Sequence, residues 1–258
     1  MAYVHDDERL KARFNRTALL FGEEVLNTFL QSSVAVVGLG GVGSFAAELL
    51  ARSGIGRIVL VDFDRINISN TNRQIQALTS TIGKQKSEVL RSRLIDINPA
   101  AEITAHSEFC DSGNREILLR GSDFIIDAID SLGPKSGLLE FAFRSGKRII
   151  SCMGAANRID PSKISMADIS EVKGCPLARR VRRYLRKKGI EQGIPVIYSS
   201  EEPLPLHKIT EKVKEFPSLV RGRERETLGS TSYLPAIIAS WAVSYVLRDL
   251  ANDSSEDL

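Results

Sequence analysis

The stretch VVGLGGVGSFAAELLARSGIGRIVLVDFD, residues 36–64, decides the fold. It starts in an apolar, β-branched run and carries the pattern G-x-G-x-x-G at Gly38, Gly40 and Gly43. Helical periodicity then runs to Ser53, and a second apolar run, RIVLVD, follows. Strand, glycine turn, helix and strand form one βαβ unit of a parallel sheet, and the glycines allow a tight turn and close approach of the backbone to a phosphate. The stretch therefore predicts a nucleotide site.

The alternation of apolar runs and helical periodicity continues through the chain. Helices are predicted over residues 84–97, 114–120 and 134–145, and strands over residues 102–105, 124–127 and 148–153. We predict an α/β fold with a Rossmann-like, doubly wound, mainly parallel sheet and a smaller C-terminal extension. The domains would be residues 1–155, with an N-terminal helical arm, and residues 156–258. The extension would hold short strands within 155–169, a basic helix over 176–188, a strand over 195–199, a mobile loop at about 203–231 and a final helix over 233–250.

Composition restricts the class of protein. The 258 residues are 43% apolar, and 35 Lys and Arg nearly balance 32 Asp and Glu, so attraction to nucleic acid would need local clustering of charge. The cysteines at 110, 152 and 175 form no C-x-x-C pair, which predicts no zinc site. The polar N-terminus has no targeting pattern, and the longest apolar stretch, residues 233–247, is shorter than the ~20 residues of a membrane span. We predict a cytoplasmic protein whose last helix packs inside the fold.

The residues after the glycine pattern bear on whether the nucleotide is NAD or ATP. Asp62 lies 19 residues after Gly43, where its carboxylate can accept hydrogen bonds from the ribose hydroxyls of NAD or of ATP. The next segment, NTNRQIQALTSTIGKQK, places Arg73 and Lys86 near the phosphates. Two cations have no evident task beside an intact pyrophosphate, but they lower the barrier to breaking a triphosphate. The simpler alternatives are an exposed loop arginine and a solvated helix lysine.

Carboxylates follow the strand at residues 124–127. Asp130 would lie at the carboxyl edge of the sheet and suits Mg²⁺, which takes one or two carboxylates besides phosphate oxygens. The alternative for Asp130 is an N-cap of the helix that starts near Pro134. Asp127, at the end of the strand itself, is interpreted as its structural companion.

As a set, GLGGVG, VDFD, NTNRQ, Lys86 and DAID resemble the ubiquitin-activating-enzyme-like adenylyltransferases, over about residues 13–155. The resemblance implies ATP and Mg²⁺ as cofactors, with Arg73 and Lys86 stabilising the phosphates and Asp130 binding the metal. It also implies that Arg16 reaches the ATP of a partner subunit, and hence a homodimer; otherwise Arg16 is an ordinary arginine of an amphipathic helix. The implied nucleotide contacts are Gly38, Gly40, Gly41, Gly43, Asp62, Asp64, Asn70, Gln74, Ala128 and Ile129.

The C-terminal half favours one branch of that family. The sulfur-carrier activators typically carry two C-x-x-C zinc pairs, which are missing here, whereas PLARRVRRYLRKKGI and IPVIYSSEEP resemble the tRNA threonylcarbamoyladenosine dehydratase branch. This resemblance spans about residues 10–205 and the final helix. It implies that tRNA is the partner, and that a modified adenosine beside the anticodon is cyclised through an acyl adenylate. A sulfur-transfer accessory protein and a monovalent cation are left open, and Cys175, where an acid is expected, is interpreted as an incidental thiol.

Basic residues cluster in the extension. Eight occur between Lys173 and Lys188 with no acid among them, and apolar residues at 177, 181, 184 and 185 would turn the basic ones outward. Such a ridge suits RNA phosphates, with added Lys and Arg from 208–225; the alternative is a solvated helix face. The predicted RNA-binding residues are Arg179, Arg180, Arg182, Arg183, Arg186 and Lys187. Besides the dehydratase, the open alternatives are an activator of a ubiquitin-like or sulfur-carrier protein, an NAD(P)-dependent oxidoreductase and a non-catalytic RNA-binding module.

Overall fold

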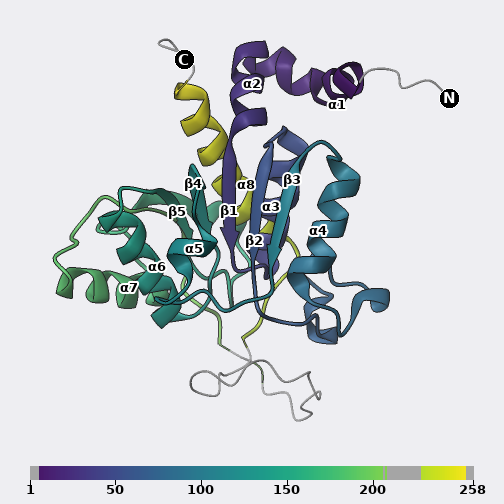
Figure 1. The fold of residues 1–258 in the computed structure, drawn as a ribbon. Helices are drawn as coiled ribbons and strands as arrows, with labels where there is room; N and C mark the ends of the chain where they lie inside the picture. The colour runs from purple at the N-terminus through teal and green to yellow at the C-terminus, as the bar shows by residue number, and fades with distance from the viewer. Residues whose placement is uncertain (1–5, 206, 208–227, 254–258) are drawn as a thin grey trace.

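A seven-stranded sheet forms the centre of the protein (Figure 1). The computed structural model describes residues 6–205, 207 and 228–253. The strand order is β3-β2-β1-β4-β5-β7-β6, and every neighbouring pair is parallel except β6 with β7. The strands are β1 Ser33–Val37, β2 Arg57–Val61, β3 Glu102–His106, β4 Phe124–Asp127, β5 Arg148–Cys152, β6 Ile164–Asp168 and β7 Pro195–Ser199.

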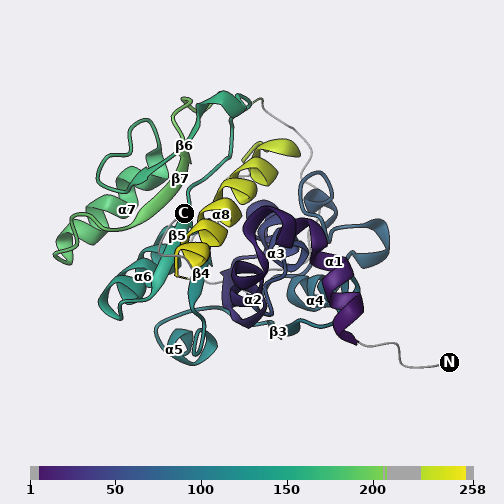
Figure 2. The same cartoon turned by 90° about the horizontal axis from the view of Figure 1, so that it is seen from above.

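Helices cover both faces of this sheet (Figure 2). One face carries α3, α4 and α8, and the other carries α5, α6 and α7. The helices are α1 Asp6–Phe21, α2 Glu23–Gln31, α3 Gly41–Ser53, α4 Lys86–Ile97, α5 Arg115–Leu118, α6 Leu132–Arg144, α7 Pro176–Lys187 and α8 Tyr233–Asn252. Short 3₁₀ turns are η1 Ile68–Asn70, η2 Thr79–Thr81 and η3 Pro161–Lys163. The doubly wound α/β fold class is confirmed.

Successive residues of β1 face opposite sides of the sheet, so they enter different cores. Val34 and Val36 pack in the core with α3 and α8, whereas Ala35 and Val37 pack in the core with α6 and α7. All four are buried. Because both faces are covered, β1 reads as a continuous apolar run.

The last helix, α8, is long and apolar enough by composition to cross a membrane, and half of its most apolar window is buried. Its buried residues, among them Ile238, Ala242 and Val246, join the core that contains α3 and the central strands. This packing agrees with the predicted internal helix. Because β7 and β6 extend the same sheet, the proposed division at residue 155 stays a prediction.

Element bounds differ from the sequence predictions in a few places. The helix predicted from Pro134 begins at Leu132, since proline fits a first helical turn, where its missing N–H has no partner in any case. The region predicted as short strands, 155–169, forms one strand, β6, after the turn η3. Most of the predicted mobile loop, 206 and 208–227, lies outside the described residues.

Strands β1 and β4 are neighbours in the sheet, and the order in which the chain adds strands reverses between them. Strands β1, β2 and β3 proceed outward to one edge, and β4 returns to the other side of β1. In open α/β sheets, ligands bind beyond the carboxyl ends of the strands at such a switch point. The loops after β1 and β4 are therefore where a ligand is expected.

Candidate functional site

The loop from β1 to α3 leaves no space for side chains at two of its glycines. Gly38 has φ +89°, and an added Cβ would lie 2.8 Å from the carbonyl oxygen of Ala128. A Cβ on Gly43 would lie 1.8 Å from the carbonyl oxygen of Gly38. Gly40, in contrast, has nothing within 4 Å of an added Cβ. The backbone at the start of α3 is thus open to a phosphate, and the helix N-terminus favours that negative charge.

Asp62 follows β2 and holds the glycine loop. Its carboxylate accepts hydrogen bonds from the backbone N–H of Leu39, at 2.6 Å, and of Asp64, at 2.8 Å. Burial raises the pKa of the Asp62 carboxyl above its ordinary value. Asp62 is therefore fixed beside the loop, at the strand end where it was predicted to meet ribose.

Lys86 is buried at the start of α4 and is not the solvated helix lysine of the simpler alternative. Its Nζ lies 2.9 Å from Oδ2 of Asp64, and the lysine side chain is only 7% exposed. Burial by itself lowers the pKa of Lys86, but the charges of Asp62, Asp64 and Asp130 outweigh it and raise the pKa. The Lys86 ammonium therefore stays charged. Because it is buried, solvent screens its interactions with nearby charges only weakly.

Arg73 lies between the glycine loop and the start of α8. Its Nη1 donates to the carbonyl oxygen of Ser69, at 2.9 Å, and to Oδ1 of Asn72, at 2.8 Å. An added Cβ on Gly41 would come within 3.4 Å of Cγ of Arg73, so the arginine stem flanks the loop. Arg73 is half-buried, and these hydrogen bonds join its guanidinium to its own loop, so its role at the phosphates stays a prediction.

Two polar residues of the same segment are buried. Asn70 accepts a hydrogen bond from the N–H of Asn67, at 3.0 Å, and closes the turn η1. Gln74 lies 3.4 Å from Nε2 of Gln76. In this structure Asn70 shapes the segment that carries Arg73, which supports a positioning role.

Asp130 follows β4 in an exposed turn. Its Oδ1 accepts a hydrogen bond from the Ser131 hydroxyl, at 3.2 Å, and its charge acts on Lys86. The N-cap residue of α6 is Ser131, so the alternative of Asp130 as the N-cap is wrong. Ala128 and Ile129, in the same turn, are half-buried and lie against Gly38.

Asp127 forms a completely buried ion pair beneath this turn. Nζ of Lys135 lies 2.6 Å from its Oδ2, and both side chains are 0% exposed. Lys135 also donates to Oγ of Ser151 and to the carbonyl oxygen of Cys152, while the other Asp127 oxygen accepts from the N–H of Ile129, at 3.1 Å. Asp127 is the structural companion that was predicted, and Lys135 is a partner that the sequence analysis missed.

Sequence reasoning also missed Gln76. Its Nε2 donates to the carbonyl oxygen of Leu39, at 2.8 Å, and so braces the glycine loop. Among the described residues, Oδ1 of Asp64 and Oε1 of Gln76 are buried and have no hydrogen-bond partner. The sequence around Gln76 does not predict this role, because only the folded chain brings the Gln76 side chain to Leu39.

Arg16 does not join these residues within one chain. It is exposed on α1, two residues after Phe14, whose ring lies 3.5 Å from an added Cβ on Gly54. Gly54 caps the C-terminal end of α3, whereas the glycine loop is at its N-terminal end. A helix of 13 residues spans about 20 Å. Arg16 is therefore distant from the nucleotide site of its own chain.

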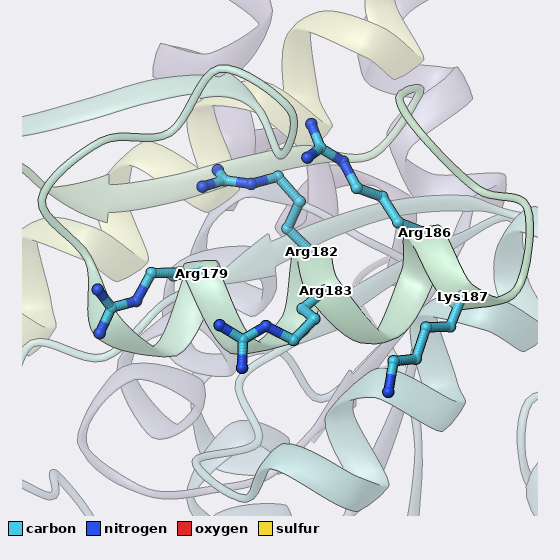
Figure 3. Close-up of a pocket in the computed structure, with 5 residues that line it drawn as sticks. All are labelled: Arg179, Arg182, Arg183, Arg186 and Lys187. Carbon is cyan, nitrogen blue, oxygen red and sulfur yellow. The ribbon is translucent and has the colours of Figure 1, made fainter.

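The basic helix α7 forms as predicted, and Figure 3 shows five of its cations. The hollow between them is lined by Arg179, Arg182, Arg183, Arg186 and Lys187. Ala178, Val181 and Leu185 are buried, while the predicted core residues Leu177 and Tyr184 are only half-buried. Arg182 differs from the predicted outward orientation: its Nη1 donates to the carbonyl oxygens of Ile169 and Val172, because the preceding loop folds back over it.

Comparison with known proteins gives consistent matches. The ThiF family matches residues 14–258. The tRNA threonylcarbamoyladenosine dehydratase of Bacillus subtilis is 40% identical over 243 residues, covering 93% of this chain and 95% of the relative. That of Escherichia coli is 38% identical over 200 residues, covering 74% of each. The crystal structure of the E. coli enzyme in complex with ATP superposes with a TM-score of 0.84 at 32% identity, covering 100% of each chain.

Proposed function

The protein belongs to the ThiF family, and from this premise we infer that it is an ATP-dependent tRNA threonylcarbamoyladenosine dehydratase. The observation that carries the inference is the convergence of the glycine loop, Asp62, the Lys86–Asp64 pair and Asp130 beyond β1 and β4. The Bacillus subtilis relative named as a dehydratase matches 93% of the chain, so the match extends well beyond residue 155.

The proposed reaction uses these groups as follows. The threonyl carboxylate of the modified nucleoside attacks the α-phosphate of ATP, giving an acyl adenylate and pyrophosphate. Lys86 and Arg73 stabilise the negative charge that moves onto the pyrophosphate, and backbone N–H groups at the start of α3 hold the phosphates. The neighbouring carbamoyl group then closes onto the activated carbonyl and expels AMP. The nucleoside thus loses the elements of water, with its carboxylate oxygen leaving in AMP and ATP converted to AMP and pyrophosphate, and no covalent bond to the enzyme forms.

A magnesium ion fits the carboxylates present. Mg²⁺ usually takes one or two carboxylates together with phosphate oxygens. Asp130 is exposed at the site, and Oδ1 of Asp64 is buried without a hydrogen-bond partner. When bound, the ion would supply further neutralisation of phosphate charge. Among the described residues, no group of three His, Cys, Asp or Glu side chains is placed to hold a metal ion.

The basic ridge of α7 supports binding of the tRNA backbone. Replacing Arg179, Arg183 and Arg186 with Ala should reduce the slope of log affinity against log salt by about 3, because each phosphate contact contributes about 0.9. Arg248→Ala, which removes an exposed arginine on α8, is the matched control and should leave the slope unchanged. Equal slopes for the triple variant and the control would contradict this role.

A homodimer would bring Arg16 to the site of a partner. Leu19 and Leu20, on the same helix, are 79% and 77% exposed, which is unusual for leucines that face only solvent. Mixing the inactive variants Arg16→Ala and Lys86→Met should restore activity, since the mixed dimer contains one site with both residues intact. An inactive mixture that still forms mixed dimers would place Arg16 outside the site.

Substrate choice tests the proposed function. Purified protein should release pyrophosphate from ATP with tRNA that carries threonylcarbamoyladenosine, but not with tRNA that lacks the modification or with a ubiquitin-like carrier protein. Mass spectrometry of the digested tRNA should show a nucleoside lighter by one water. Pyrophosphate release that depends on the carrier protein would instead support the alternative function, activation of a ubiquitin-like or sulfur-carrier protein.

A further inference from the structure

Exposed apolar side chains gather around the start of α8, and the mechanism above does not use them. Ile159, Leu204 and Tyr233 are 52%, 43% and 43% exposed. We call these three the Tyr233 patch. The phenol of Tyr233 donates a hydrogen bond to the carbonyl oxygen of Ile159, at 2.7 Å, so the ring is fixed while much of its surface faces outward. Apolar groups exposed together mark binding surfaces more often than single ones do.

The backbone beneath the patch is held by Asn157. It is the one non-glycine residue with positive φ in the part of the chain that the structure describes, at 59°. Its N–H donates to the carbonyl oxygen of Gly229, its side-chain oxygen accepts from the N–H of Gly229, and its own carbonyl accepts from the N–H of Leu204. Sparsely populated backbone conformations persist where the surroundings enforce them, and they cluster at ligand sites.

Arg158 anchors the same loop from inside. Its guanidinium is buried and donates to the carbonyl oxygens of Gly154, Ala156 and Glu201. The Glu201 carboxylate in turn accepts from the N–H groups of Ile159 and Asp160. The Tyr233 patch is thus a preorganised surface, which lowers the entropy cost of binding a ligand.

The patch borders the nucleotide site. An added Cβ on Gly41 would lie 3.1 Å from Cβ of the buried Pro235. Pro235 follows Tyr233 by two residues in α8, so the two side chains leave the helix on nearly opposite sides. Nδ2 of Asn72, the neighbour of Arg73, donates to the carbonyl oxygen of Ser230, at 3.2 Å. The segment that carries Tyr233 therefore touches the residues that handle the triphosphate.

We propose that the Tyr233 patch binds the adenine base of the substrate nucleoside, with the base stacked on the ring of Tyr233. This inference rests on the proposed function. Unpaired RNA bases are recognised by stacking on aromatic side chains. The threonyl side chain of the nucleoside would then reach past the start of α8 toward Gly41 and Arg73. Tyr233 is then a specificity-determining residue of the cyclisation.

Three variants test this assignment. Tyr233→Leu keeps an apolar side chain but removes the aromatic face, and should lower kcat/KM for modified tRNA about 10- to 100-fold, mainly through KM. Tyr233→Phe keeps the face and should stay within about threefold of the wild type. Trp241→Leu removes another exposed aromatic ring of α8, 41% exposed, and is the matched control with no expected change. The Kd of ATP, measured without RNA, should be the same for all three.

Several results would overturn the proposal. An unchanged kcat/KM in Tyr233→Leu would show that no base stacks there. A parallel loss of ATP affinity would show a damaged nucleotide site, and a shift in oligomeric mass would show that the patch is an interface between copies of the chain. Failure of the proposed function is separate, because then the wild-type protein itself would not cyclise the modified nucleoside.

Discussion

Lys135 and Asp127 offer a sharp test of how the site is held, because both are completely buried beneath the turn that carries Asp130. Lys135→Met leaves the Asp127 carboxylate without its cation, although Ser151 and Ile129 still donate to it. Breaking a buried pair by removing one partner costs about 3–5 kcal/mol. This cost is a large share of the free energy of unfolding of a typical domain, ~5–15 kcal/mol.

The loss can be measured by urea unfolding. With a slope near 3 kcal/mol/M for a chain of this size, the midpoint should fall by about 1–2 M. The double variant Asp127→Leu with Lys135→Met should recover most of this loss, since well-packed apolar groups often replace a buried pair without cost. The ATP affinity of the double variant should nevertheless be lower than that of the wild type, because the hydrogen bond from Ile129 to Asp127 is gone. A change below about 1 kcal/mol in Lys135→Met would refute the reasoning.

Three further outcomes are expected. Gly43→Ala should abolish ATP binding in calorimetry, because its Cβ would lie 1.8 Å from the carbonyl oxygen of Gly38; wild-type affinity would contradict this turn geometry. Burial alone would raise the pKa of Glu48, but hydrogen bonds from Arg93 and Arg52 outweigh it and lower the pKa. Glu48→Gln should therefore cost about 1 kcal/mol of unfolding free energy at pH 7, and the cost should vanish as the pH falls below the folded pKa; a pH-independent cost would argue against the ion pairs. Burial raises the pKa of Cys110 to about 11 and of Cys152 to about 12, so neither thiol should react with a disulfide reagent at pH 8 until the protein unfolds, and rapid native labelling would contradict that burial.

The sequence predicts the centre of the fold well because its signals there are local. The apolar run at 124–127 and the strand at 195–199 have the predicted bounds, and the glycine spacing identifies the turn before α3. The antiparallel direction of β6 was not predicted. The direction of an edge strand relative to its neighbour depends on which edge of the sheet is free to pair with it. That is a property of the assembled sheet and not of the local sequence.

The site shows the same division between local and long-range information. Motif spacing predicts that Asp62, Lys86 and Asp130 lie at strand and helix ends, and the structure places them there. Gln76 and Lys135 were missed, since their roles come from hydrogen bonds to Leu39 and Asp127 that form only in the folded chain.

The rate of pyrophosphate release in Lys86→Met tests the central claim most directly. The claim is that cations are placed to break the phosphoanhydride rather than only to bind it. Lys84→Met is the matched control, since Lys84 is exposed two residues away. Pyrophosphate release with modified tRNA at saturating ATP should fall about 10²- to 10³-fold in Lys86→Met and stay unchanged in Lys84→Met. A wild-type rate in Lys86→Met would contradict the account.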